Sequence, residues 1–457
     1  GTPVLGQQAQ INAETFSQLE LGYALPTGCG PFSPDGNLMS VSGDGLYDLT
    51  SGRRRFPTQD PDGFYASFSP DGRLMATIAD GLYDTNTGEK LLGFSGHPGF
   101  FSPDGTFLAV NEEGLYDVAS RALIFRITQF GLYPNPIFSP DGTLLAAARD
   151  GVYDLITMQK LYTTEGFNIA FSPDSLWLLT DDGVYDAHTG ELRVPITCNL
   201  CLATVSQSGT YLAIDGDGVY KLPEFARLFD LDPEYEANNH PPVFSPDETL
   251  LVSDAVYRIP TGEYVAAASV QGEFNTDGSR FAAYWDYLFN TDTWETIIPL
   301  ERYAYFALGG DVLAVGWDAV YNAATGEKYT SIASGYTRFN DPQTRITVEN
   351  HWISGRYTHE TTDFCLVYGL PGTDWPYRSG LVHVDDSVNL RSAPNPNSPI
   401  VTTTARTDLP VFAVSPDGAW LKVAEETWVA NWVVEVISLP PDLPVEDSFP
   451  TSQSTLP

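Results

Sequence analysis

Short apolar runs separated by tight-turn residues dominate the first 340 residues of the chain. Runs such as Leu144 to Ala147 and Val152 to Leu155 are only a few residues long and consist mostly of residues that suit β-strands. The segments between such runs carry Pro, Asp and Gly, the residues that tight turns require. Because no helical periodicity is evident over this part, the pattern predicts an all-β fold.

Three turn signatures recur in a fixed order. The phrase Phe-Ser-Pro-Asp-Gly, or a looser version of it, starts ten units, at Phe32, Phe68, Phe101, Phe138, Phe171, Val205, Phe244, Phe274, Phe306 and Phe339. About 15 residues later comes Gly-Leu-Tyr-Asp or Gly-Val-Tyr-Asp, as at Tyr47 and Tyr153, and in several units Thr-Gly-Glu follows, as at 87–89. Each signature is a tight turn between extended runs. One unit of about 34 residues is therefore predicted to form four short antiparallel strands.

A four-stranded unit without helices buries both of its faces only by stacking on copies of itself, as the blades of a propeller do. The phrase Phe-Ser-Pro-Asp-Gly with strands on either side resembles the WD-repeat and TolB-like family of β-propellers over roughly residues 28–365. The resemblance implies a many-bladed β-propeller. It leaves the activity open, because such propellers scaffold, bind and occasionally catalyse.

Two departures from this family, and one feature that related propellers share, give three expectations about the propeller. Ten units exceed the usual 4–8 blades, so a large closed ring, an open arc and two smaller rings are all alternatives. The unit is shorter than the ~40–45 residues of a WD repeat, and the loss lies before Tyr-Asp, so we expect a shortened third strand. Residues Phe16 to Leu25 precede the first unit, and we expect them to form a lone strand that completes the last blade.

The C-terminal part carries a different pattern. The segments Val388-Asn389-Leu390-Arg391-Ser392, Trp420-Leu421-Lys422-Val423 and Thr427-Trp428-Val429 together resemble the bacterial SH3-like domain over residues 381–438. The resemblance implies a small β-barrel, a bacterial cell-surface setting and binding of cell-wall peptide. The residues proposed for its ligand groove are Asn389, Arg391, Trp420 and Trp428. The alternative is that the aromatic residues, with Leu390 and Trp432, form the core of the barrel.

The patterns divide the chain into five parts. We expect an N-terminal extension over 1–15, a propeller over 16–365, a linker over 366–380, the SH3-like domain over 381–438 and a tail rich in Pro, Ser and Thr over 439–457. A long segment, Pro223 to Pro242, interrupts the propeller repeats. It is either a partner-binding loop or filler in a decayed repeat.

Charge limits the partners. The 23 basic and 59 acidic residues leave a net charge of −36, and nucleic-acid binding requires a basic surface. No apolar stretch reaches the length that a spanning helix needs, so we expect a soluble chain without a membrane span. The remaining partner classes are proteins, including copies of this chain, and cell-wall peptide.

The sequence lacks the motifs that are typical of serine hydrolases and of zinc sites. The chain has no Gly-x-Ser-x-Gly elbow for a serine nucleophile and no His-x-x-x-His pair for zinc. Asp-Gly pairs such as 215–218 suit calcium, but the full twelve-residue calcium loop is missing, and tight turns need the same residues. We therefore assign no catalytic, cofactor-binding or metal-binding residue and no cofactor, and we expect a protein that is not an enzyme.

The four cysteines suggest one long-range crosslink. Cys29 opens the first unit and Cys365 follows the last, so a closed ring would bring them together and a disulfide would join the ends of the array. Cys198 and Cys201 then bond each other or stay reduced. Four buried thiols are the alternative.

These observations favour a non-catalytic, secreted bacterial cell-surface protein with a structural or protein-interaction role. We expect it to assemble into oligomers or filaments through its terminal tails, because an extended segment can pair with the edge of a blade in the next copy. One alternative is a protein that binds cell-wall peptide or glycan through the SH3-like domain. The least favoured alternative is a propeller hydrolase.

Overall fold

The structure is a computed structural model. It describes residues 11, 13–25, 28–41, 44–58, 66–77, 80–95, 98–127, 136–196, 202–231, 241–253, 255–267, 271–316, 319–329, 336–339, 346–353, 361–370, 378–384, 387–404, 407–424 and 426–446. The chain groups into two compact units. Unit 1 comprises Gly1–Phe64, Ala314–Asn322 and Glu327–Pro457, and unit 2 comprises Tyr65–Leu313 and Ala323–Gly326.

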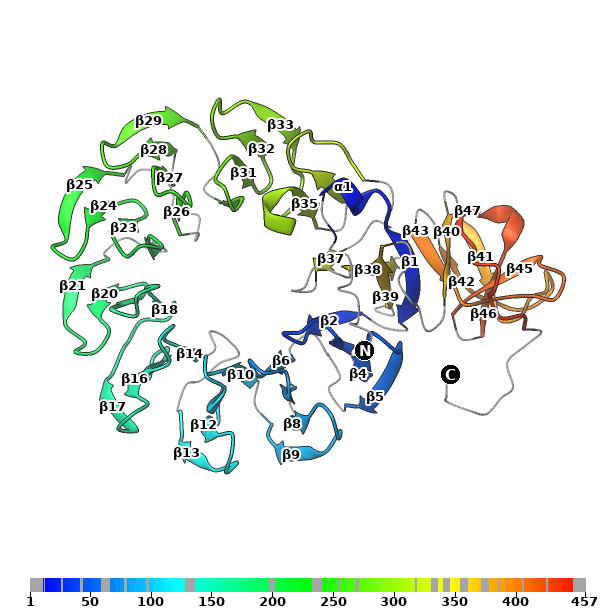
Figure 1. Cartoon of the computed structure of the whole chain (residues 1–457), viewed down its shortest axis with the longest axis horizontal. Helices are drawn as coiled ribbons and strands as arrows, with labels where there is room; N and C mark the ends of the chain where they lie inside the picture. Colours follow the sequence, from blue (N-terminus) through cyan, green and yellow to red (C-terminus); the bar gives the residue numbers. More distant parts are fainter. Residues whose placement is uncertain are drawn as a thin grey trace, which may run out of the picture. The chain divides into compact units, whose positions relative to one another are not determined.

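Ten antiparallel sheets follow one another along the described part of the first 370 residues, and together they make a multi-bladed β-propeller. Figure 1 shows them as successive small sheets. The first blade consists of β2 (Cys29–Phe32), β3 (Leu38–Val41), β4 (Gly45–Asp48) and β5 (Arg53–Pro57). The second consists of β6 (Ser67–Phe68), β7 (Leu74–Ala76), β8 (Gly81–Asp84) and β9 (Lys90–Gly93). The third consists of β10 (Pro98–Phe101), β11 (Phe107–Val110), β12 (Gly114–Asp117) and β13 (Leu123–Phe125).

Blades four to eight repeat this arrangement. The fourth consists of β14 (Ile137–Phe138), β15 (Leu144–Ala147), β16 (Gly151–Asp154) and β17 (Gln159–Tyr162), and the fifth of β18 (Ala170–Phe171), β19 (Trp177–Leu179), β20 (Gly183–Asp186) and β21 (Leu192–Pro195). The sixth consists of β22 (Ala203–Val205), β23 (Tyr211–Ile214), β24 (Gly218–Lys221) and β25 (Ala226–Asp230). The seventh consists of β26 (Val243–Phe244), β27 (Leu250–Val252), β28 (Val256–Arg258) and β29 (Glu263–Ala266), and the eighth of β30 (Gly272–Phe274), β31 (Arg280–Ala283), β32 (Tyr287–Asn290) and β33 (Thr296–Pro299).

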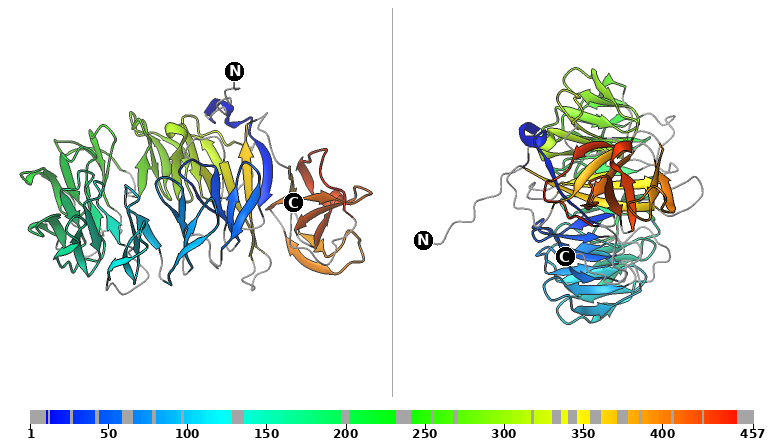
Figure 2. Two further views of the ribbon diagram at one scale, coloured as in Figure 1. Left: turned by 60° about the horizontal axis from the view of Figure 1, so that its bottom comes forward. Right: turned by 90° about the vertical axis from the view of Figure 1, so that its right-hand side faces the viewer.

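The last two blades depart from the pattern. The ninth is a three-stranded sheet of β34 (Ala304–Ala307), β35 (Val312–Val315) and β36 (Ala319–Asn322), with the 3-10 turn η1 (Leu308–Gly310) between its first two strands. The tenth consists of β37 (Tyr336–Phe339), β38 (Ile346–Ile353), β39 (Thr361–Gly369) and, from the other end of the sequence, β1 (Glu20–Leu25). Figures 1 and 2 show β1 beside β39. The prediction that an N-terminal strand completes the last blade is therefore confirmed.

Within a blade, the strands are short because a tight turn follows every few residues. In the first blade β3 pairs with β4 from Leu38 opposite Asp48 to Val41 opposite Gly45, four residues against four. Blade four repeats this register, from Leu144 opposite Asp154 to Ala147 opposite Gly151. β4, the third strand of the first blade, is as short as its partner β3, so the whole hairpin is short.

Apolar side chains fill the space between consecutive blades. The four residues of β15 are all buried, so both faces of the strand are covered. One apolar cluster joins Leu108 of blade three to Phe94 and Leu82 of blade two, and further clusters join the later blades of unit 2 in the same way. The turn phrase adds a close contact: a Cβ built on Gly105, whose φ is +74°, would lie 3.4 Å from Cδ of Pro70 in the preceding copy.

The first and tenth blades pack together within unit 1. Cys29 and Cys365 form a disulfide with a Cα–Cα distance of 5.0 Å, across 336 residues of sequence. Both cysteines are fully buried in a cluster that includes Tyr23 of β1 and Met39 of β3. The Tyr23 hydroxyl donates a 2.8 Å hydrogen bond to the Leu49 carbonyl, which ties β1 to the first blade as well.

The structure moves the expected N-terminal boundaries. Residues 13–16 form the short helix α1 (Ala13–Phe16), so the strand begins at Glu20 rather than at Phe16. Ile11 and Phe16 are buried, and the Phe16 ring packs 4.5 Å from the Tyr329 ring. The described residues of 1–15 therefore belong to the folded unit, because Ile11 and the adjoining Phe16 pack into its interior.

The C-terminal domain covers residues 380–446. It holds a three-stranded sheet, in the order β43 (Thr407–Val411), β40 (Gly380–Val384), β47 (Glu435–Ser438), and a five-stranded sheet, in the order β42 (Ile400–Thr404), β41 (Val388–Arg391), β46 (Thr427–Ala430), β45 (Trp420–Ala424), β44 (Ala413–Val414), with the 3-10 turn η2 (Asn431–Val433) after β46. Buried Val and Leu side chains from both sheets form its core.

The linker and tail boundaries move as well. The expected linker over 366–380 starts inside β39, which runs to Gly369, and ends at Ser379, whose N–H donates a 3.0 Å hydrogen bond to the Gly22 carbonyl of β1. The expected tail over 439–457 contributes to the C-terminal domain as far as Glu446: Leu443 is buried in its core, and Val445 forms a parallel bridge with Val414. Apolar residues among the prolines explain this docking.

Candidate functional site

An uncharged apolar pocket lies on the first strands of blades two, three and four. Its volume is about 380 Å³. Three consecutive copies of the Phe-Ser-Pro phrase line it, together with the residue that precedes each phrase: Ser67, Phe68, Pro70, Phe100, Phe101, Ser102, Pro103, Ile137, Phe138, Ser139 and Pro140. None of these side chains is ionisable. The pocket is therefore a product of the repeat itself.

The turn chemistry of the phrase holds the lining residues in place. In blade three the Ser102 hydroxyl donates a 2.6 Å hydrogen bond to Asp104 and accepts a 2.9 Å hydrogen bond from the Phe107 N–H. Ser69 makes the same pair of hydrogen bonds in blade two. The hydrogen bond from Ser102 lowers the pKa of Asp104, so the carboxylate that fixes the turn is charged at neutral pH.

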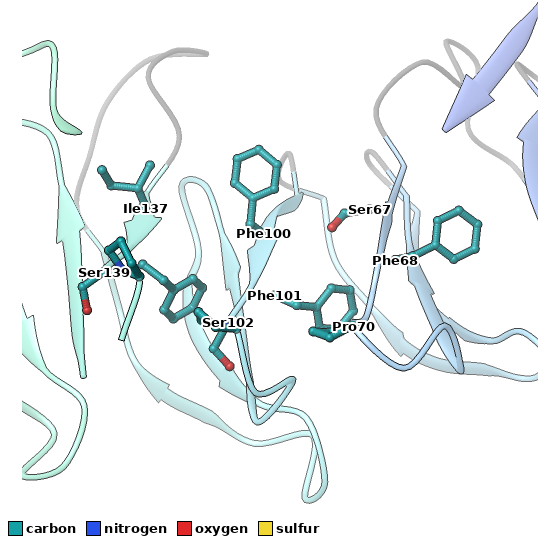
Figure 3. Close-up of a pocket in the computed structure, with 11 residues that line it drawn as sticks. Ser67, Phe68, Pro70, Phe100, Phe101, Ser102, Ile137 and Ser139 are labelled. Atoms are coloured by element: carbon teal, nitrogen blue, oxygen red, sulfur yellow. The ribbon is translucent and has the colours of Figure 1, made fainter. Parts of the chain in front are cut away.

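Phe100 distinguishes the third copy from its neighbours. The residue before the phrase is Ser67 in blade two and Ile137 in blade four, and Figure 3 shows the Phe100 ring between these two side chains. Phe100 is 56% exposed, whereas Phe101, the next residue, is 8% exposed. An exposed ring beside a row of phenylalanines and prolines presents a surface for apolar contact.

The chemistry of this pocket suits binding rather than catalysis. Its lining offers aromatic rings, proline rings and serine hydroxyls, and two of the serines are engaged in their own turns. No group in the lining supplies an acid, a base or an activated nucleophile. Aromatic and proline-lined grooves recognise extended, proline-containing segments of protein.

A second, polar pocket of about 290 Å³ lies between blades seven and eight. It arises where the repeat changes: Arg258 stands after Tyr257, in the position that Asp154 and four other aspartates occupy in blades one to five. Arg258 lies 3.5 Å from Glu263. Asp247, in the same lining, accepts hydrogen bonds from Ser245 and Thr249. Its carboxylate therefore stabilises its own turn, as the aspartates of the other turn phrases do.

The residues predicted for a ligand groove in 381–438 do not come together as one. Trp428 is 1% exposed and Trp420 is 5% exposed, so both rings belong to the interior of the domain. Arg391 donates a 2.6 Å hydrogen bond to the Ser398 carbonyl, whereas Asn389 is exposed. The groove prediction is wrong for the two tryptophans, because they fill the core. The alternative is wrong for Trp432, which is 63% exposed.

Two recurrent arrangements were missed by the sequence reasoning. In blade two the Tyr83 hydroxyl donates to Asp80, which also pairs with Lys90, and blade four repeats this with Tyr153, Asp150 and Lys160. Burial and the hydrogen bond to Asp80 raise the pKa of Tyr83. The signal was present in the sequence as a lysine ten residues after the Asp of Asp-Gly-Leu-Tyr or its equivalent.

The second missed arrangement is a further copy of the turn phrase in the C-terminal domain. Val414-Ser415-Pro416-Asp417-Gly418 matches the propeller phrase. The Ser415 hydroxyl donates a 2.5 Å hydrogen bond to Asp417 and accepts one from the Trp420 N–H. The phrase is therefore a general hairpin device in this chain.

Cys29 and Cys365 are joined, while Cys198 and Cys201 lie outside the described residues. The segment Pro223 to Pro242, expected as a partner-binding loop or as filler, contains β25, and its residues 232–240 lie outside the described part. Among the described residues no group of three His, Cys, Asp or Glu side chains could hold a metal ion. None of the helices there has the length and apolarity to cross a membrane.

Comparison with solved structures finds distant likenesses. No family model matches the chain, and no curated protein matches it. A crystal structure of a eukaryotic initiation factor is 16% identical, with a TM-score of 0.41 over 67% of this chain and 86% of that one. The β-propeller domain of Cps50 (Swd1) from Myceliophteria thermophila is 14% identical, with a TM-score of 0.32 over 77% of this chain and 99% of that one. The class of the protein, a multi-bladed β-propeller, rests on its own sheets.

Proposed function

We propose that the protein is a non-catalytic protein-interaction protein of the bacterial cell surface that assembles with copies of itself. The observation that carries the proposal is the uncharged pocket on blades two to four. On a chain with a net charge of −36, mutual repulsion opposes contact between copies. An uncharged, partly aromatic pocket offers a place where a protein segment can bind against that repulsion.

The disulfide supports a location outside the cell. Disulfides persist in oxidising compartments and are rare where the cytosol keeps thiols reduced. Cys29 and Cys365 join segments 336 residues apart, and both are fully buried. The bacterial cell-surface setting rests on the SH3-like sequence pattern of 381–438. Immunolabelling of intact cells of the native host tests the location, and labelling only after cell lysis contradicts it.

Sedimentation velocity of the purified chain tests the assembly. Repulsion between acidic surfaces is screened over about 8 Å at 0.15 M salt and about 3 Å at 1 M, so assembly should strengthen as salt rises. Phe100→Ser should reduce it. Tyr264→Ser is the matched control, since Tyr264 is 61% exposed in β29 and does not line the pocket. A chain that is monomeric at every salt concentration contradicts the proposed assembly.

A second candidate function is binding of cell-wall peptide or glycan through the SH3-like domain. The observation that favours it is Trp432, which is 63% exposed and meets the Trp420 ring edge-on at 5.5 Å. A buried ring that supports an exposed one makes a rigid surface for a ligand. Co-sedimentation with purified cell wall tests this function. Trp432→Ala should abolish the co-sedimentation. If wild type does not bind the cell wall, or if wild type and variant bind it equally, this second function is wrong.

A further inference from the structure

We infer that residues 447–457 of a second copy occupy the apolar pocket on blades two to four. The inference rests on the proposed self-assembly and names the segment that would bind. The sequence pattern predicted assembly through the terminal tails, including the whole of residues 439–457. Residues 439–446 are engaged within their own C-terminal domain, so the part of this tail that we assign to binding elsewhere is the part after Glu446.

The segment starts from a fixed point. The Glu446 N–H donates a 2.9 Å hydrogen bond to the Val414 carbonyl, and the Val414 N–H donates a 2.8 Å hydrogen bond to the Pro444 carbonyl. The Glu446 carboxylate lies 2.6 Å from Nζ of Lys422, whose side chain is only 5% exposed. Eleven residues follow this anchor. At about 3.3 Å each when extended, they span up to roughly 36 Å.

The composition of the segment matches the pocket. It reads Asp-Ser-Phe-Pro-Thr-Ser-Gln-Ser-Thr-Leu-Pro, with Phe449-Pro450 and Leu456-Pro457 as two apolar pairs. Asp447 is its one charged side chain, so the segment approaches an acidic chain with little repulsion. Prolines favour the extended polyproline II conformation, which aromatic-lined grooves bind at low entropic cost.

The pocket supplies complementary groups. Phe100 offers an exposed ring, and Pro103 and Pro140 line the same pocket from two successive copies of the phrase. Because the lining carries no charge, covering it with the two apolar pairs desolvates no ion of the pocket. The donor and the acceptor are different surfaces of the chain. Such a head-to-tail contact builds a filament unless its rotation closes a ring.

Complementation between two defective chains tests the inference. The first variant lacks residues 447–457 and keeps 439–446, and the second carries Phe100→Ser. A deletion of residues 1–10 is the control for the loss of a terminal segment. Sedimentation velocity at about 1 M salt should show larger assemblies for wild type and for the control, and monomers for each defective variant. An equimolar mixture of the two should stop at a one-to-one dimer, because only one intact segment and one intact pocket can meet.

A labelled peptide of residues 447–457 supplies an independent readout. Fluorescence anisotropy should show saturable binding to the chain that lacks 447–457 and at least tenfold weaker binding to the same chain with Phe100→Ser. Equal affinity for both overturns the inference. Unchanged circular dichroism of the Phe100→Ser variant controls for folding, and Phe100→Tyr should retain binding.

The outcomes separate this inference from the proposed function. If deletion of 447–457 leaves assembly intact, the inference is wrong while self-assembly stands. If wild type stays monomeric at every salt concentration, self-assembly itself is wrong. If wild type is monomeric and the peptide still binds through Phe100, the segment occupies the pocket of its own copy, which overturns the assignment to a second copy.

Discussion

Removing the disulfide between Cys29 and Cys365 should destabilise unit 1. The link closes a loop of 336 residues between the first and tenth blades. In the chain-entropy description the loop contributes about 5.8 kcal/mol at 25 °C by restricting the unfolded chain. Measured losses for native disulfides are about 2–5 kcal/mol, so we expect about 4 kcal/mol for Cys29→Ala/Cys365→Ala.

The assay is differential scanning calorimetry of three samples: oxidised wild type, reduced wild type and the double variant. A loss of about 4 kcal/mol should lower the transition of unit 1 by roughly 8–16 °C for a unit of 150–250 residues. Cys198→Ala/Cys201→Ala is the control, since it removes the other two cysteines and leaves the long-range link in place. Reduction should lower the transition of this control as it lowers that of wild type.

An unchanged transition of wild type on reduction, or peptide mapping without reduction that finds Cys29 unlinked to Cys365, would contradict this prediction. A large loss in the double variant together with no effect of reduction would assign the stability to packing of the buried side chains instead. Both sulfurs are fully buried beside Met39 and Tyr23, so the reduced sample is the decisive comparison.

Three further predictions concern the blades. Tyr23→Phe leaves the Leu49 carbonyl without its 2.8 Å partner in a buried site, and chemical denaturation should show a loss of about 1–2 kcal/mol; no change would mean that water replaces the hydroxyl. Gly105→Ala places a side chain at φ +74° and 3.4 Å from Pro70, so it should lower the free energy of unfolding by about 1–2 kcal/mol. Gly93→Ala is the milder control, because a Cβ there meets nothing nearer than 3.7 Å and Gly93 has no positive φ. Burial and the hydrogen bond to Asp217 raise the pKa of Tyr220 to about 12. The contribution of Tyr220 to the free energy of unfolding should therefore be full below pH 10 and be lost from pH 10 to 12, and Tyr220→Phe should flatten that loss.

The turn phrase also has a pH dependence of opposite sign. The hydrogen bond from Ser69 lowers the pKa of Asp71, and Ser102 does the same for Asp104. Each carboxylate therefore stabilises the fold above the unfolded pKa of about 4, and this contribution is lost as the pH falls through the lower folded value. Together the aspartates and tyrosines confine the most stable state to the range between acid and strongly alkaline pH.

Much of the propeller could be predicted from local sequence because its turns are local. Phe-Ser-Pro-Asp-Gly specifies a hairpin with its own hydrogen bonds, from the Ser102 hydroxyl to Asp104 and from the Phe107 N–H to Ser102. The apolar runs between turns are too short for helices. The number of units and the strand pairing within the first eight blades follow from interactions within about 34 residues, whereas the central strands are buried only by the neighbouring blades.

Tertiary structure decided the features that depend on partners distant in sequence. Trp428 and Trp432 lie four residues apart in one motif, yet one is 1% exposed and the other 63% exposed, because only the surrounding sheets determine which side faces the core. The pocket likewise needs Phe100 of one blade beside Ser67 and Ile137 of two others. The expected tail is divided at Glu446 for the same reason: residues up to this point find Val414 and Lys422 to bind, and composition alone does not encode where such a surface lies.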